Sequence, residues 1–217
     1  MNYRELIQDS NVFSALRDEC NVIFDTNKRL PQQVFRREFA EYDAFEHGMI
    51  TSQEFAPFLT KIARSFGDRA VNYMTLDPDP VEYYHKNRGF YGLASFEPSA
   101  LIDNYFKVMS RDWKSADSFI ARGGDVGVIW GSSAQWGIFC DRISWELCLM
   151  ASHSPIDESI MSIVRKEAFQ VSNYELNLYR NRPAVALEFS RNLAQTYPAL
   201  VQKRRENAGT DNAGTDG

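Results

Sequence analysis

Few of the residues and motifs that reveal a protein's chemistry occur in this chain. It has 3 cysteines and 3 histidines among 217 residues. Three widely spaced cysteines argue against a disulfide framework, and no histidine stands in a spacing typical of a zinc site. The chain also has no Walker loop, no GxGxxG and no CxxC motif. We therefore expect no metal, no cofactor and no catalytic residue, and the sequence favours a protein that is not an enzyme.

Basic charge and long apolar runs are also lacking. The net charge is −5, whereas proteins that bind nucleic acid usually present a basic surface. No stretch approaches the roughly 18 apolar residues of a membrane span, and the N-terminus has no apolar segment of signal-peptide type. We expect a cytoplasmic protein with no nucleic-acid or membrane partner.

The remaining composition is that of a globular domain. Hydrophobic residues make up 44% and charged residues 24% of the chain. We expect a single domain over residues 1–206. The last residues, 207–217, repeat the pentapeptide Asn-Ala-Gly-Thr-Asp and contain no apolar residue except alanine. Such a composition predicts a disordered tail.

Helical periodicity appears at both ends of the chain. The N-terminal half has amphipathic runs at 11–24, 34–42 and 52–66, and a fourth lies at 99–110. Near the C-terminus, Ser154-Pro155 and Pro183 each have the pattern of a helix start. The pattern predicts a helical segment over 155–206, and leaves open whether that segment packs on the rest or forms an interaction arm.

The middle of the chain reads as strands. Strand-length segments lie at 70–76, 90–96, 125–131, 135–141 and 144–150, and the last three have very short connections. The fold class we predict is α+β, with an antiparallel sheet of about five strands, a sheet core at about 70–151 and helices packed on one face.

Alternation along the last two strands predicts which side chains share a face. A two-residue loop at Arg142-Ile143 would pair Phe139 with Glu146. One face would then be apolar, with Trp136, Ile138, Cys140, Trp145, Leu147 and Leu149. The other face would be mixed, with Gly137, Phe139, Asp141, Ser144, Glu146 and Cys148. A register error of one residue would exchange the faces of one strand.

One segment resembles the calcium loop of an EF-hand. In DAFEHGMITSQE, Asp43, Gly48 and Glu54 occupy loop positions 1, 6 and 12. Positions 3 and 5 are Phe45 and His47, which supply no oxygen ligand. We therefore interpret the segment as a glycine turn followed by a capped helix.

The mixed face of the sheet is the candidate binding surface. Aromatic residues with acidic neighbours are typical of protein interfaces. We predict that Tyr84, Phe139, Asp141 and Glu146 contact a protein partner. Two alternatives are an enzyme with a pocket near Asp141, Glu146 or His85, and a small-molecule sensor or accessory protein whose helical tail mediates oligomerisation.

One region also resembles a known class of proteins. The segment VGVIWGSSAQWGIFCDRISWELCLMAS, preceded by LDPDPVEYYHKNRGFYGLASF, is similar to small cytoplasmic bacterial proteins that act as immunity factors in toxin systems. The resemblance covers about 70–151 and lies in the order of strand, helix and hairpin and in the WGSSxxWG turn. It implies a non-catalytic protein that binds a cognate toxin, and the acidity of the chain suits a basic toxin domain.

Overall fold

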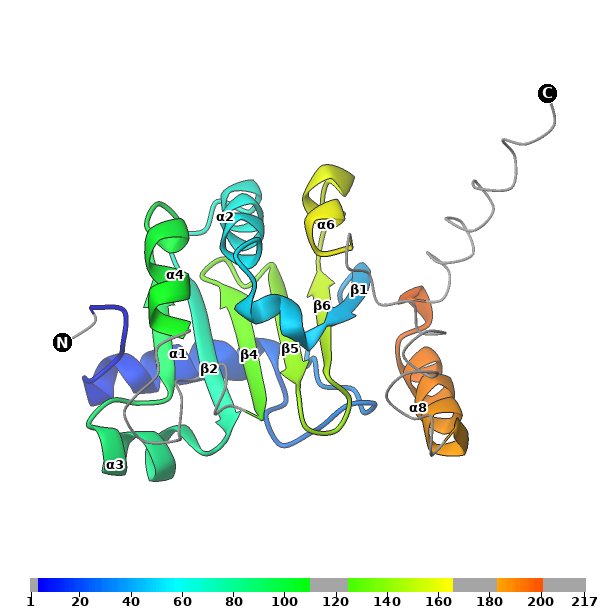
Figure 1. Ribbon diagram of the computed structural model, residues 1–217, viewed down its shortest axis with the longest axis horizontal. Coiled ribbons are helices and arrows are strands. Elements are labelled where there is room, and N and C mark those ends of the chain that lie inside the picture. Colours follow the sequence, from blue (N-terminus) through cyan, green and yellow to red (C-terminus); the bar gives the residue numbers. More distant parts are fainter. Residues whose placement is uncertain (1–3, 110–124, 166–182, 201–217) are drawn as a thin grey trace.

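Six antiparallel strands form one sheet in the order β1-β6-β5-β4-β2-β3 (Figure 1). The computed structural model describes residues 4–109, 125–165 and 183–200. The expected α+β class with an antiparallel sheet is confirmed, and the sheet has six strands where about five were predicted. The strands are β1 (Glu41–Glu46), β2 (Val71–Asp77), β3 (Leu93–Phe96), β4 (Val126–Gly131), β5 (Trp136–Asp141) and β6 (Leu147–Ser152).

Helices connect these strands and follow them. The described helices are α1 (Ser10–Ile23), α2 (Phe55–Ser65), α3 (Lys86–Arg88), α4 (Leu101–Met109), α6 (Glu158–Arg165) and α8 (Pro183–Thr196), with short turns of helix η1 (His47–Thr51) and η2 (Pro80–His85). The predictions for 11–24, 52–66 and 99–110 correspond to α1, α2 and α4. The predicted helix at 34–42 is wrong, because Phe35 forms a β-bridge with Phe24 and β1 begins at Glu41.

The first face of the sheet is covered by α2, α4 and α6. In Figure 1, α2 lies between α4 and α6. These helices bury Phe58, Tyr105 and Met161 against Ile138 and other sheet residues. Pro57 is tolerated because it lies in the first turn of α2, where its missing N–H leaves no helical hydrogen bond unmade.

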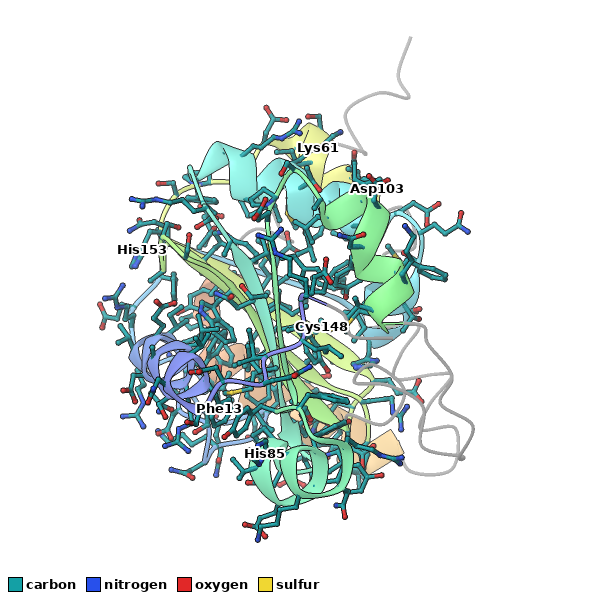
Figure 2. The ribbon with its side chains drawn as sticks, turned by 90° about the vertical axis from the view of Figure 1, so that its left-hand side faces the viewer. Phe13, Lys61, His85, Asp103, Cys148 and His153 are labelled. Carbon is teal, nitrogen blue, oxygen red and sulfur yellow. The ribbon has the colours of Figure 1, made fainter. Side chains whose placement is uncertain are left out.

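The second face is covered by α1, α8 and the segment between α1 and β1. Figure 2 shows α1 on the opposite side of the sheet from α2 and α4. Here Phe24 and Phe189 lie in one core with Val128, Phe139 and Leu149. Helices therefore pack on both faces, whereas the sequence predicted one.

A different register between β5 and β6 explains the second covered face. Phe139 pairs with Leu149 and Cys140 pairs with Cys148, so the predicted pairing of Phe139 with Glu146 is wrong. The connection is longer than two residues, and β6 starts only after Glu146, whose φ of 48° belongs to a turn. The shift of three residues turns the side chains of β6 over, which gives both faces of the sheet an apolar surface.

The WGSS turn between β4 and β5 is tied to the start of β2. The Asp68 carboxylate accepts hydrogen bonds from the Ser133 N–H (2.6 Å) and from the Trp136 indole N–H (2.7 Å). Gly131 is required beside it, since a Cβ there would lie 2.2 Å from a carboxylate oxygen of Asp68. The turn that carried the resemblance to immunity proteins thus has a structural role in this fold.

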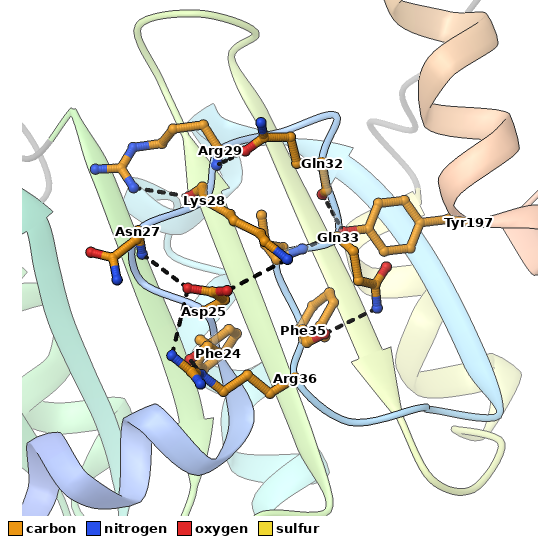
Figure 3. Close-up of polar contacts among 11 residues, drawn as sticks. Phe24, Asp25, Asn27, Lys28, Arg29, Gln32, Gln33, Phe35, Arg36 and Tyr197 are labelled. Atoms are coloured by element: carbon orange, nitrogen blue, oxygen red, sulfur yellow. Dashed lines mark hydrogen bonds and ion pairs between the residues drawn. The ribbon is translucent and has the colours of Figure 1, made fainter.

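The end of α8 is anchored to the segment before β1. The Tyr197 hydroxyl accepts a hydrogen bond from the Val34 N–H (2.9 Å) and donates one to the Gln32 carbonyl (2.8 Å) (Figure 3). Phe189 and Tyr197 are buried in the second core. The described part of the predicted segment 155–206 therefore packs on the sheet through α6 and α8. The predicted disordered tail at 207–217 lies outside the described residues.

Candidate functional site

Among the strands of the described residues, β1 is the edge of the sheet with an open side. At the opposite edge, the backbone of residues 5–7 forms hydrogen bonds with the backbone of β3 and of the residues just before it. For example, the Ser95 N–H donates to the Glu5 carbonyl (2.9 Å). On β1, the His47 N–H donates to the Glu146 carbonyl (2.8 Å), so odd-numbered residues direct their backbone groups toward β6. Tyr42, Ala44 and Glu46 therefore direct theirs outward, where the described residues offer no backbone partner.

Carboxylates surround this open side. Glu41, Asp43 and Glu46 lie on β1. Glu146 lies beside the end of this strand, because its backbone carbonyl accepts a hydrogen bond from the His47 N–H. We call these four residues the acidic edge. No lysine or arginine occurs between Glu38 and Thr60 in the sequence. The stretch itself supplies no basic residue, so its carboxylates give the edge an acidic character that would attract a positively charged ligand.

One of the outward backbone N–H groups of β1 already has a side-chain partner. The Asp43 carboxylate accepts the Ala44 N–H at 2.9 Å, which satisfies the central outward donor of β1. A strand that paired here would have to replace this bond. A basic side chain beside Asp43 would favour the exchange by giving its carboxylate another partner.

A hollow lies next to the acidic edge, between β1, β6 and α6. Its wall combines carboxylates with apolar side chains, and its volume of about 10 Å³ is that of a single water molecule, so it would receive only the end of a side chain. The lining residues are Glu41, Tyr42, Asp43, Met150, Ser152, Ile156 and Met161.

His47 closes the end of β1 inside the protein. Its side chain is buried, and burial lowers the pKa of the imidazole from 6.5 to about 4, with a smaller contribution from the positive charge of Arg142. Arg142 is itself within 3.0 Å of the Asp125 carboxylate. At neutral pH His47 is therefore an uncharged structural residue.

The four predicted contact residues are not brought together on one surface. Tyr84 lies in the first core and Phe139 in the second, and both are buried. Asp141 is fully buried, and its carboxylate accepts the Ser144 N–H at 2.9 Å. Burial does not support a direct contact of these three with a partner. Only Glu146 is exposed, and it belongs to the acidic edge.

Burial also governs the ionisation of Asp141. It raises the pKa of the carboxyl above 3.8, and the hydrogen bonds from Ser144 and the charge of Arg29 offset this only in part. For the enzyme alternative we expect a concave pocket in which Asp141, Glu146 or His85 has a strongly shifted pKa. The hollow beside β1 does not include Asp141.

The calcium-like segment forms a strand followed by a turn of helix. Asp43 lies within β1, while Gly48 is in η1 and Glu54 precedes α2. The Asp43 carboxylate is bound to the Ala44 N–H. Within the described ranges, no three histidine, cysteine, aspartate or glutamate side chains are grouped so as to hold a metal ion.

The other candidate side chains have structural contacts. His85 stacks on Tyr91 with ring centroids 4.2 Å apart, and His153 lies 4.5 Å from Phe39. The Ser132 hydroxyl accepts the Arg69 N–H (2.9 Å). These side chains stabilise loops at the ends of the sheet.

Sequence reasoning missed the acidic edge because it assigned 34–42 to a helix and interpreted 43–54 as a glycine turn followed by a helix, whereas β1 spans Glu41–Glu46. The absence of lysine and arginine from 38–60 was a signal that could have found it. No family model, no curated protein and no solved structure matches the chain. In the ranges that the structure covers, no helix has the length and apolar composition of a bilayer span.

Proposed function

We propose that this chain is a non-catalytic protein-binding module of the cytoplasm, which binds an extended, basic segment of its partner along the open side of β1. In its specific form, it is an immunity protein that neutralises a bacterial toxin by this contact. The observation that carries the proposal is the combination of outward backbone groups and carboxylates at the acidic edge.

Backbone geometry supports addition of a strand at this edge. Helices cover both faces of the sheet, and residues 5–7 cover much of the edge at β3. A partner strand beside β1 would bond to the outward groups of Tyr42, Ala44 and Glu46, which is the mode known as β-augmentation. The small hollow next to Glu41 and Asp43 would accept the end of one side chain of that strand.

Charge supports a basic partner over a second copy of the chain. Acidic residues on an edge strand oppose pairing with another acidic strand. An antiparallel pair of two β1 strands that bond through Tyr42 and Ala44 and are centred on Asp43 would place the Asp43 carboxylates of the two copies opposite each other. Like charges placed opposite each other destabilise a pair, whereas a basic strand is attracted and associates faster.

The test is capture of the partner from native lysate by the immobilised chain and by three variants. Glu41→Lys combined with Glu46→Lys reverses the charge of the edge. Ala44→Pro removes one outward N–H and leaves the β1–β6 ladder intact, since proline is tolerated on an edge strand. The matched control, Asp18→Lys with Glu19→Lys, makes the same change of charge on the exposed side of α1.

We expect the wild type and the α1 control to retain one basic protein in stoichiometric amount. Both edge variants should lose it, although their thermal unfolding stays cooperative. Equal retention by all four proteins would refute binding at β1, and retention of no protein would refute the binding function. For an immunity protein, expression of the captured partner alone should arrest growth, and co-expression of this chain should restore it.

A further inference from the structure

Two cysteines face each other across strands β5 and β6. Cys140 and Cys148 are direct partners in the ladder, and their sulfur atoms lie 2.8 Å apart. Both are free thiols and both are fully buried. The sequence placed them on opposite faces of the sheet, and the observed register brings them together on the first face.

The backbone pattern shows which kind of pair they form. The Arg142 N–H donates to the Asp125 carbonyl on the β4 side, and the His153 N–H donates to the Gln135 carbonyl across β5 and β6. Even-numbered residues of β5 therefore bond toward β4 and odd-numbered residues toward β6. Cys140 thus faces Cys148 at a non-hydrogen-bonded position, where side chains approach most closely.

This position fits the geometry of a disulfide. Opposite residues in a non-hydrogen-bonded pair have Cα atoms about 4.5 Å apart, and disulfides join Cα atoms separated by about 4.4–6.8 Å. The third cysteine, Cys20, lies in the second core on the other side of the sheet. In the folded chain, only Cys140 and Cys148 are therefore placed to join.

We infer that Cys140 and Cys148 form an intrachain disulfide when the chain folds, or opens, in the presence of a low-molecular-weight disulfide such as oxidised glutathione. One cysteine thiolate attacks the glutathione disulfide, forms a mixed disulfide and releases one glutathione thiolate. The second cysteine loses its proton and attacks the protein sulfur of the mixed disulfide, which releases the second glutathione. Two protein thiols are oxidised, and one glutathione disulfide is reduced to two thiols.

Burial determines when the reaction occurs. Thiolates attack disulfides, whereas buried thiols in apolar surroundings stay protonated. Burial and the neighbouring Cys140 raise the pKa of the Cys148 thiol. The native chain is therefore protected, and the pair reacts before β6 docks on β5 or when the two strands separate.

The experiment compares native and refolded full-length chain in a mixture of oxidised and reduced glutathione. The chain is then unfolded in denaturant at mildly acidic pH, so that its buried free thiols can be alkylated by a maleimide. It is weighed before and after alkylation, and again after trypsin. Arg142 lies between Cys140 and Cys148, and each of the three cysteines falls in a different tryptic peptide. A link between the peptides of Cys140 and Cys148 is therefore unambiguous by mass.

Before alkylation, we expect the refolded chain to weigh about 2 Da less than the reduced chain, the mass of two hydrogen atoms. After alkylation it should carry one alkyl group, on Cys20. The peptides 123–142 and 143–165 should be linked. Native chain exposed to the same mixture for a short time should keep all three thiols. The oxidised protein should melt about 5 °C higher, because the bridge restricts the unfolded chain.

Variants separate this pairing from other oxidation. Cys20→Ser should leave the linked peptides unchanged, whereas Cys140→Ala and Cys148→Ala should each abolish them. The mass measurement on the wild-type chain decides the matter even if an alanine variant does not fold. Three alkylated cysteines after refolding with oxidised glutathione, or a link that involves Cys20, would overturn the inference.

Discussion

Protonation of His47 should lower the stability of this protein in acid. The imidazole is buried beside the end of β1, and burial lowers its pKa from 6.5 to about 4. In the unfolded chain the same imidazole takes up a proton near pH 6.5. Between these two values the unfolded state binds a proton that the folded state does not. The contribution of His47 to stability is therefore complete above pH 6.5 and is lost as the pH falls toward 4.

The size of the effect follows from the two pKa values. At pH 4.5 the unfolded imidazole is almost fully protonated, and the folded imidazole, with its pKa of about 4, is mostly neutral. The difference in proton binding corresponds to about 2.5 kcal/mol between pH 7.5 and pH 4.5. A change of that size is a large part of the stability of an ordinary domain.

The assay is urea unfolding at half-unit steps between pH 4.5 and pH 7.5, for the wild type and His47→Gln. Other groups also titrate in this range, so the informative quantity is the difference between the two proteins at each pH. We expect the advantage of the wild type at pH 7.5 to fall by about 2.5 kcal/mol at pH 4.5. The control, His153→Gln, should follow the wild-type pH dependence, because it leaves His47 in place.

Parallel curves for the wild type and His47→Gln would refute the reasoning, since they would mean that the imidazole has the same pKa in both states. A difference that grows as the pH falls, in favour of the wild type, would mean that the folded protein stabilises the charged imidazole. Two-dimensional NMR of the histidine ring would show the folded-state titration directly.

Three further predictions concern stability and use the same assay. Gly131→Ala should lower the free energy of unfolding by about 2 kcal/mol or more, because the alanine Cβ would lie 2.2 Å from the Asp68 carboxylate and displace the hydrogen bonds of that carboxylate. Full stability in this variant would contradict the structural role of Asp68. Tyr197→Phe removes the hydroxyl that joins α8 to Val34 and should cost about 1–3 kcal/mol, which an unchanged urea midpoint would disprove. Burial raises the pKa of the Asp141 carboxyl, so the wild type loses stability as the pH rises above the pKa of this group in the unfolded chain. The variant Asp141→Asn should therefore be more stable than the wild type at pH 7 and gain little at pH 4. An equal effect at both pH values would argue against a raised pKa.

The parts of the fold that sequence patterns predicted best are those with local signals. α4 and β4 were placed within two residues, because amphipathic spacing and an apolar run between glycines are visible in a short window. β1 was missed, since its two faces both meet helices, with Phe45 in the first core and Tyr42 against the second. A strand covered on both faces has no clear alternation to detect.

The register of β5 and β6 could not be predicted from alternation. Strands buried on both faces tolerate either assignment of their side chains, and the length of the connecting loop decides between them. Glu146 extends that loop by adopting a φ of 48°, which no turn signal of the asparagine-glycine kind announced. The consequence was large, because the shift by an odd number of residues moved Phe139 from an expected surface into the second core and brought Cys140 opposite Cys148.

The same error in register explains why the candidate site differs from the predicted one. If helices covered one face only, the other face would be a broad surface on which a partner could lie, and Phe139 and Asp141 would be its centre. With both faces covered, the described part of the sheet offers a partner only its ends and the outer side of β1. A partner that binds there gains backbone hydrogen bonds whatever its sequence. Its selectivity must then come from the carboxylates of the acidic edge and from the hollow beside them, so reversing Glu41 and Glu46 should change which protein is bound more than proline at Ala44 does.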